Sequence, residues 1–142
     1  MTTVFVYGTL KSGHGNHRLL ADKRVNYLGR KSLVGPYRMI DLGAFPGVVE
    51  IANNSQLSNT IHGELYSVPD DVFMSLDMLE GHPDFYERKR VALEAGGTTV
   101  HPNPWIYLLP RSYLSERKVI DTGLWEPTKD ELAFYATKEA AG

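Results

Sequence analysis

The segment VFVYGTLKSGHGNHRLL, residues 4–20, carries the first strand and the first turn of the chain. Its first four residues are β-branched or aromatic, which predicts a buried strand over 4–7. Gly8 then permits backbone angles that a side chain would block. A strand that ends at a glycine turn can leave several N–H groups unpaired, and such groups bind anions or carbonyl oxygens. An ordinary strand-to-loop turn is the alternative interpretation.

The composition is typical of a soluble globular protein. The chain has 142 residues, of which 42% are hydrophobic and 23% are charged, and this length suffices for one domain with a core. A net charge of −2 without a long basic run argues against nucleic-acid binding. No apolar stretch approaches the roughly 20 residues of a membrane span, and no secretion signal is evident. The chain has no cysteine, which excludes disulfides and cysteine nucleophiles, and we expect a cytoplasmic protein.

Many short extended segments alternate with turns that contain glycine or proline. We expect strands or extended segments at 32–42, 48–51, 61–68, 88–94 and 105–109, and a helical turn at 16–20. This pattern predicts an α+β fold, in which a small mixed β-barrel, closed or nearly closed, carries a few short helices. No repeat or linker divides the chain, so residues 1–142 are interpreted as a single domain. Thr128 and Glu131 form a capping box, which predicts a structural helix in a C-terminal extension from about residue 126.

A further helix is predicted at 70–80. Asp70-Asp71 lie at its start, where the helix dipole favours acidic residues, and Gly81 can end it. With about 100° between successive residues, the apolar positions share one face: Val72, Leu76 and Leu79, with Phe73 at the edge. Glu80 falls inside this apolar sector, whereas Asp77 is expected to point towards the polar side.

A carboxylate on a buried helix face is the strongest anomaly in the sequence. Burial penalises the charged form and raises the pKa of the carboxyl, and the negative end of the helix dipole acts in the same direction. A raised pKa suits a general acid or base that works near neutral pH. Glu80 is therefore a candidate catalytic residue. The alternatives are a salt bridge to a nearby arginine, or a frayed last turn that exposes Glu80 to water.

Six segments together carry a resemblance to a known family. They are VFVYGTLKSGHGNHRLL at 4–20, YRMIDLGAFPGVV at 37–49, HGELYSV at 62–68, LDMLEGHPDFYERKRV at 76–91, WIYLL at 105–109 and VIDTGLW at 119–125. The combination of YGTLK with a downstream LDxLEGxPxxYxR is the specific part. In this order the segments resemble the γ-glutamylcyclotransferase-like family, which includes the γ-glutamylamine cyclotransferases and the plant AIG2-like proteins.

The resemblance implies a β-barrel with a ligand pocket at one side. It implies that the loop Tyr7-Gly8-Thr9-Leu10 holds the γ-glutamyl part of a substrate through backbone groups, and that Glu80 is the acid/base residue. Tyr86 matches the aromatic residue of the family at this position. Its hydroxyl could orient the substrate or Glu80, or the ring could simply pack under the barrel.

The implied reaction needs few parts. The α-amino nitrogen of a γ-glutamyl amide attacks the side-chain carbonyl of the same molecule, forms 5-oxoproline and expels an amine. Because the substrate supplies the nucleophile, neither a metal nor a cofactor is required, and the enzyme must hold a folded conformer of the substrate. Glu80 can move the protons, and the amides of Gly8, Thr9 and Leu10 are candidate donors to the developing oxyanion.

Other residues carry weaker signals. Tyr37 and Tyr107 could also reach the pocket. Arg88 could pair with a carboxylate of the substrate or of the protein, and a structural ion pair is the favoured interpretation. His14 and His17 lie three residues apart without an HExxH motif or acidic partners, so no metal site is predicted.

The sequence leaves three functions open. They are a cyclotransferase that acts on γ-glutamyl-amines or related γ-glutamyl amides, a non-catalytic module that binds a small ligand or a protein, and an enzyme that acts on another acyl amide. Glu80 favours an enzyme, because a binding module has no need of an inward acid. The leaving amine stays open, because the outer wall of the pocket is expected to come from the loops 43–47, 53–60 and 110–118.

Overall fold

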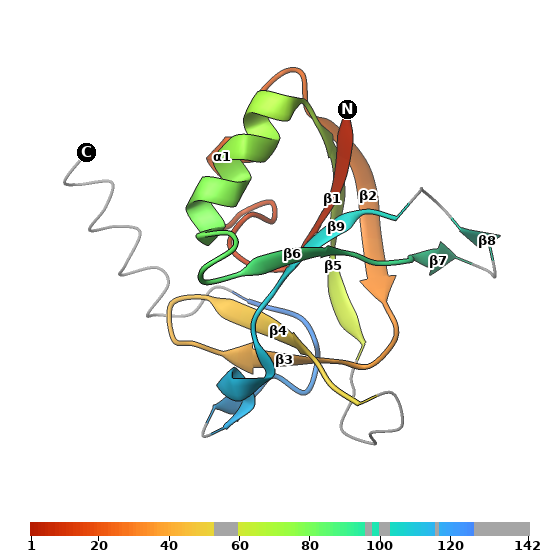
Figure 1. Cartoon of the computed structure of the whole chain (residues 1–142). Helices are drawn as coiled ribbons and strands as arrows, with labels where there is room; N and C mark the ends of the chain where they lie inside the picture. Colours follow the sequence, from red (N-terminus) through yellow and green to blue (C-terminus); the bar gives the residue numbers. More distant parts are fainter. Residues whose placement is uncertain (53–59, 96–97, 100–102, 116, 127–142) are drawn as a thin grey trace.

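Strand β1 (Thr2–Val6) lies in the middle of a five-stranded sheet in the computed structural model of the chain (Figure 1). The strand order is β2-β5-β1-β9-β6, with β2 at Asn26–Leu33, β5 at Ile61–Val68, β9 at Trp105–Leu108 and β6 at Glu87–Arg90. Strand β1 pairs antiparallel with β5 and parallel with β9. The structure describes residues 1–52, 60–95, 98–99, 103–115 and 117–126.

A second, three-stranded sheet lies beside the first. It contains β10 (Lys118–Val119), β3 (Tyr37–Asp41) and β4 (Pro46–Glu50), and a short pair is formed by β7 (Glu94–Ala95) and β8 (Thr98–Thr99). The two larger sheets meet where Val49 bridges Leu109 and the Leu109 N–H donates to the Val48 carbonyl at 2.9 Å. The α+β class is confirmed, but a closed barrel is not: over the described residues, the five-stranded sheet ends at β2 and β6.

Side chains on both faces of β1 are buried, which explains the continuous apolar run at the start of the chain. Val4 and Val6 pack in a cluster that includes residues of helix α1 (Asp70–Glu80). Phe5 and Tyr7 face the other way and pack in a second cluster that includes Trp125. Because both faces are covered, the chain has little freedom at the point where β1 ends and the next loop begins.

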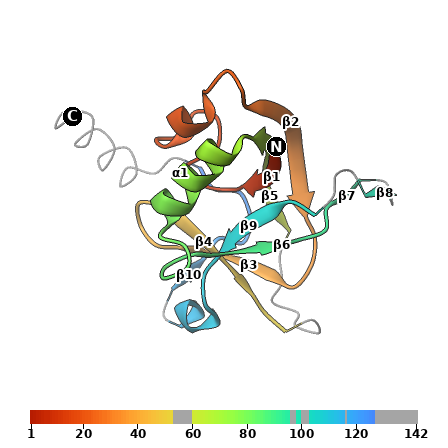
Figure 2. The ribbon, with the colours of Figure 1, turned by 45° about the horizontal axis from the view of Figure 1, so that its top comes forward.

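Helix α1 has the predicted bounds. It ends at Gly81, which adopts φ 64° and donates its N–H to the Met78 carbonyl at 3.2 Å, so the predicted left-handed glycine cap is confirmed. Val72 and Leu76 are buried against the sheet. In Figures 1 and 2, α1 lies against the five-stranded sheet, with the loop that carries the short helix η1 (His17–Leu20) beside it.

Two predictions about the faces of α1 were wrong. Leu79 is 36% exposed rather than part of the buried face, because it lies at the rim of a cavity that the sheet does not fill. Asp77 is half-buried rather than on the polar side, because Tyr107 and Arg88 reach it from the neighbouring strands β9 and β6. Helical periodicity assigns directions around the axis, and it contains no information about which polar partners another element brings.

The strand predictions were correct for the central strands and poorer for the edges. Strand β5 has the predicted bounds, whereas β2 was not predicted, because its sequence NYLGRKSL mixes polar and apolar residues without alternation. The expected segment 32–42 is divided between β2 and β3, and β6 ends at Arg90. The helix predicted from Thr128 lies outside the described residues. Within them, no helix is both long enough and apolar enough to cross a membrane.

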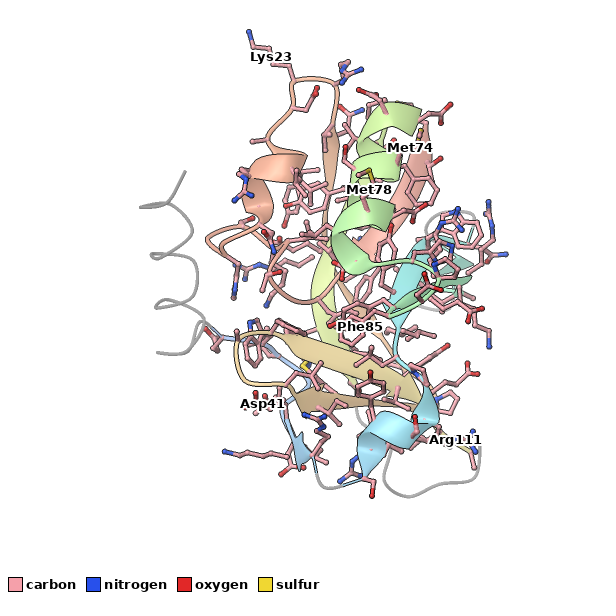
Figure 3. All side chains as sticks on the ribbon, turned by 60° about the vertical axis from the view of Figure 1, so that its left-hand side comes forward. Lys23, Asp41, Met74, Met78, Phe85 and Arg111 are labelled. Atoms are coloured by element: carbon pink, nitrogen blue, oxygen red, sulfur yellow. The ribbon has the colours of Figure 1, made fainter. Side chains whose placement is uncertain are left out.

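The packing of α1 on the sheet can be tested by removing one side chain. Leu76 is fully buried, so Leu76→Ala should lower the free energy of unfolding by about 2–5 kcal/mol, measured by urea denaturation. Met78 on the same helix is 82% exposed and points outward in Figure 3, so Met78→Ala is the matched control, with an effect within about 0.5 kcal/mol. Equal losses in the two variants would contradict this packing.

Candidate active site

A cavity of about 200 Å³ opens between the end of β1, the end of α1 and the β3–β4 turn. Its lining contains all six residues that the sequence analysis proposed for the site: Tyr7, Gly8, Thr9, Leu10, Glu80 and Tyr86. The other lining residues are Phe5, Val6, Asn16, Phe45, Pro46, Leu79, Phe85 and Tyr107. Tyr37, which could also have reached the pocket, is not among the lining residues and packs in the core cluster that includes Trp125. The described lining residues include no lysine, arginine or histidine.

The carbonyl groups of the loop after β1 are held by donors within the protein. The Gly8 carbonyl accepts from the Lys11 N–H at 3.1 Å, and the Thr9 carbonyl accepts from the Asn16 N–H at 2.9 Å. The Leu10 carbonyl lies 2.9 Å from Nδ1 of His17, and because a carbonyl only accepts, the ring nitrogen is the donor. The loop is thus fixed by three consecutive carbonyls.

This arrangement determines the direction of the amides. In a trans peptide the N–H points in the direction opposite to the carbonyl of the preceding residue. The anchored carbonyls of Gly8 and Thr9 therefore fix the directions of the N–H groups of Thr9 and Leu10. Within the described part of the chain, the N–H groups of Gly8, Thr9 and Leu10 have no hydrogen-bond acceptor. We call these three residues the amide cradle. An unpaired N–H at a cavity wall is a ready donor to a ligand oxygen.

Gly8 is required for a reason other than the predicted one. Its φ is not positive, so the turn does not depend on backbone angles that only glycine adopts. Instead, a Cβ at this position would lie 2.9 Å from Cγ of Pro46, which is closer than side-chain carbons approach. The glycine therefore allows the amide cradle to pack directly against the β3–β4 turn.

Glu80, the last residue of α1, also lines the cavity. Among the described residues its carboxyl has no hydrogen-bond or ion-pair partner, so the alternative of a structural salt bridge is not supported. Burial in the cavity wall raises the pKa of Glu80 from 4.5 to about 7. The carboxyl is consequently divided between its two protonation states near neutral pH.

Arg88 on β6 is engaged with Asp77 and not with Glu80. Nε of Arg88 lies 3.1 Å from Oδ1 of Asp77, which confirms the predicted structural ion pair. The guanidinium also lies over the rings of Phe73 and Trp105, at 4.8 Å and 4.6 Å from their centroids. Asp77 in turn accepts a hydrogen bond of 2.7 Å from the Tyr107 hydroxyl. These contacts tie the inner side of α1 to β6 and β9, one turn before Glu80.

Two tyrosines of the cavity wall, Tyr7 and Tyr86, have hydroxyls that bind the backbone. Tyr7 donates to the Tyr107 carbonyl at 2.6 Å and accepts from the Val48 N–H at 3.2 Å. Tyr86 donates to the Pro46 carbonyl at 2.6 Å. Burial, together with the nearby Glu80 charge, holds the pKa of Tyr7 well above its usual value, so its hydroxyl stays protonated. Tyr7 and Tyr86 thus shape the cavity by fixing the strands around it.

Two phenylalanines that the sequence analysis did not name line the cavity beside the β3–β4 turn. Phe45 and Phe85 make an edge contact with ring centroids 6.3 Å apart, and Phe85 also packs on Tyr113 at 5.8 Å. Figure 3 shows Phe85 between the end of α1 and the β3–β4 hairpin. Of the predicted wall loops, 43–47 is confirmed through Phe45 and Pro46, and most of 53–60 lies outside the described residues. The described part of 110–118 contributes no lining residue, so that prediction was wrong. The signal in the sequence that could have identified Phe45 is its place in a turn flanked by Gly43 and Gly47.

The described residues contain no group of three or more histidine, cysteine, aspartate or glutamate side chains that could hold a metal ion. The cavity itself offers one carboxyl with a raised pKa, a set of backbone donors and aromatic and apolar walls.

Comparison with known proteins identifies the family. The sequence model of the family described as "Gamma-glutamyl cyclotransferase, AIG2-like" matches residues 4–127, and the chain belongs to this family. The chain is 31% identical to the gamma-glutamylaminecyclotransferase of Bos taurus, over 76% of this chain and 72% of that protein. It is 28% identical to the gamma-glutamylcyclotransferase family protein YtfP of Escherichia coli, over 86% of this chain and 94% of that protein.

Solved structures share the fold. An aig2-like protein from Mus musculus superposes with a TM-score of 0.70 at 20% identity, over 89% of this chain and 88% of that one. The solution structure of ytfP from Escherichia coli gives a TM-score of 0.62 at 27% identity, over 87% of this chain and 96% of that one. The arrangement of sheets around α1 is thus the fold of this family.

The raised pKa of Glu80 makes a prediction about stability. Because the pKa of the folded state, about 7, exceeds the unfolded value of 4.5, the folded protein binds the proton more tightly. The stability that this proton contributes is complete below about pH 4.5 and is lost as the pH rises through about 7. Glu80→Gln should therefore raise the free energy of unfolding at pH 8 by about 1–3 kcal/mol, and change it much less at pH 4.5. A variant that is less stable than the wild type at pH 8 would contradict the burial of an unpaired carboxyl.

Proposed function

We propose that this chain is a cyclotransferase that converts γ-glutamyl-amines, or related γ-glutamyl amides, to 5-oxoproline and a free amine. The observation that carries the proposal is the placement of an unpaired carboxyl, Glu80, and the amide cradle on the wall of one cavity. Membership of the gamma-glutamyl cyclotransferase, AIG2-like family supports it, as does the likeness to a bovine gamma-glutamylaminecyclotransferase.

Glu80 is the proposed acid and base of the reaction. The α-amino nitrogen of the substrate attacks its γ-carbonyl carbon, which forms the ring C–N bond and moves the π electrons onto the oxygen. Glu80 takes a proton from the attacking nitrogen. When the oxyanion collapses, the bond to the leaving nitrogen breaks and Glu80 returns the proton to that nitrogen. A carboxyl with a pKa of about 7 can serve in both steps near neutral pH.

The amide cradle is the proposed partner of the oxyanion. The N–H groups of Gly8, Thr9 and Leu10 have no acceptor in the described chain, and those of Thr9 and Leu10 belong to peptides whose carbonyls are anchored. Donors that are already oriented need no reorganisation as charge develops, which makes such groups effective in a water-poor site. The same amides suit the carboxylate of the γ-glutamyl group, since the described lining residues have no cationic side chain.

The remaining requirement is to hold the substrate folded. Ring closure needs the amino nitrogen within reach of the γ-carbonyl, and a small cavity of about 200 Å³ with buried tyrosine walls restricts the extended conformers. The nucleophile belongs to the substrate, so the reaction calls for no serine, cysteine or cofactor. The single-domain interpretation of residues 1–142 and the cytoplasmic location stay predictions from the sequence.

The proposal is tested by turnover and by its dependence on Glu80. The purified protein should release 5-oxoproline, detected by mass spectrometry, from at least one member of a panel. The panel contains glutathione, γ-glutamyl dipeptides, γ-glutamyl-ε-lysine and γ-glutamylated polyamines. Glu80→Gln should abolish turnover, with an expected loss of more than about 10³-fold, while the protein still folds and binds the substrate.

The control for this variant is Glu87→Gln, which changes an exposed carboxyl on β6 and should keep wild-type turnover. An active Glu80→Gln variant would remove Glu80 from the mechanism. A well-folded protein that is silent across the whole panel would favour the non-catalytic binding module.

The pH dependence of turnover follows from the same carboxyl. As a base, Glu80 must be ionised before it accepts a proton, so kcat/KM should rise about tenfold per pH unit in acid and level off above about pH 7. The measurement is a pH–rate profile of 5-oxoproline release, with enzyme stability checked at each pH. An acid limb centred near pH 4.5, the ordinary value for glutamate, would show that the active carboxyl is not the buried Glu80.

A further inference from the structure

A second buried carboxylate, Glu64 on β5, lies outside the cavity and has no part in the proposed chemistry. The residue is only 7% exposed. Burying a carboxylate is costly unless hydrogen bonds replace its lost water. Glu64 accepts such hydrogen bonds, and their donors identify the segment that its carboxylate fixes.

Ser12 supplies two of the three donors. Its backbone N–H donates to Oε1 of Glu64 at 2.7 Å, and its hydroxyl donates to Oε2 at 2.9 Å. The third donor is the hydroxyl of Tyr66, at 3.1 Å from Oε1. Burial and the neighbouring Glu64 charge raise the pKa of Tyr66 to about 12, so this hydroxyl stays a donor across the working pH range. Hydrogen bonds to an ionised acceptor are roughly twice as strong as neutral ones.

The position of Glu64 connects it to both ends of the amide cradle. In the β1–β5 ladder, Glu64 is paired with Val6, the last residue of β1. Its side chain then binds Ser12, two residues beyond Leu10. The backbone of Glu64 thus pairs with the residue before the loop, Val6, and its carboxylate binds the residue after the loop, Ser12. Between these points, the Lys11 N–H closes a tight turn on the Gly8 carbonyl at 3.1 Å.

We propose that Glu64 is a positioning residue, which holds the amide cradle in the geometry that the reaction needs. The inference rests on the proposed function, since the cradle matters only if a substrate oxygen binds there. With Ser12 released, the loop keeps the bonds to its carbonyls but loses the fixed point at its exit, so the N–H groups of Thr9 and Leu10 are held less firmly in their direction. Glu64 acts through the loop and does not touch the substrate.

The test compares Glu64→Ala and Glu64→Gln with a matched control. Glu64→Ala should lower kcat by about 10–100-fold, with a smaller change in KM, because misaligned donors weaken chiefly the transition state. Glu64→Gln keeps the shape and one acceptor oxygen, so it should recover most of the rate. Glu50→Gln removes an exposed pair with Lys89 and should leave kcat within about twofold.

A second readout does not depend on turnover. Amide hydrogen exchange, followed by NMR, should accelerate at residues 8–12 in Glu64→Ala and stay unchanged in the β3–β4 hairpin. If Glu64→Ala does not fold, the same measurements on Ser12→Ala replace it. This variant keeps the backbone bond to Glu64 and loses the hydroxyl contacts with Glu64 and Tyr66, so a smaller acceleration at 8–12 is expected.

The outcomes separate the two proposals. Wild-type kcat in Glu64→Ala, or exchange that accelerates equally throughout the protein, overturns the positioning role and gives Glu64 a merely structural one. If the wild-type protein turns over no member of the panel, the proposed function fails, and local exchange at 8–12 still decides whether Glu64 holds the loop.

Discussion

The central constraint of this protein is an ionisable carboxyl that is kept in a cavity without a counter-charge. Helix α1 carries Glu80 into the cavity wall, and Arg88 on β6 is already paired with Asp77 and stacked on aromatic rings. Burial alone then raises the pKa of Glu80 to about 7. A salt bridge would stabilise the fold but would hold the carboxyl ionised, and so make it a poor proton donor. The unpaired state is therefore both a cost to stability and the basis of the proposed chemistry.

The amide cradle has a second constraint, which is that its N–H groups must stay unpaired within the protein and still be held in place. Strand β1 is buried on both faces, so the chain leaves it in a fixed direction. The carbonyls of Gly8, Thr9 and Leu10 are then bound by donors from residues 11–17, whereas the N–H groups of the same three residues have no acceptor within the described chain. The bound carbonyls make the loop rigid, and the proposed function of the loop belongs to its N–H groups. The dependence of such a site on a rigid frame is general, because donors that must reorganise lose most of their effect.

The elements with strong local signals were predicted from the sequence with correct bounds. Helix α1 has acidic residues at its start and a glycine cap at its end, and β5 is a continuous run between turns. Strand β2 was missed because it is an edge strand whose polar residues need no alternation. The directions of Asp77 and Leu79 were wrong for another reason. Periodicity places a residue on a helix face, whereas the partners on β6 and β9, and the cavity at the rim, come from distant segments.

The sequence by itself determined the ingredients: an open glycine turn after a buried strand, a carboxylate in an apolar helical sector, and the motifs that resemble one family. These are local features, set by propensity, capping and spacing over a few residues. Only the tertiary structure decided that the turn and the carboxylate share one cavity, that Arg88 is unavailable to Glu80, and that Pro46 rather than a backbone angle requires Gly8. Those outcomes depend on contacts between segments that lie tens of residues apart in the sequence. A local sequence pattern contains no information about such contacts.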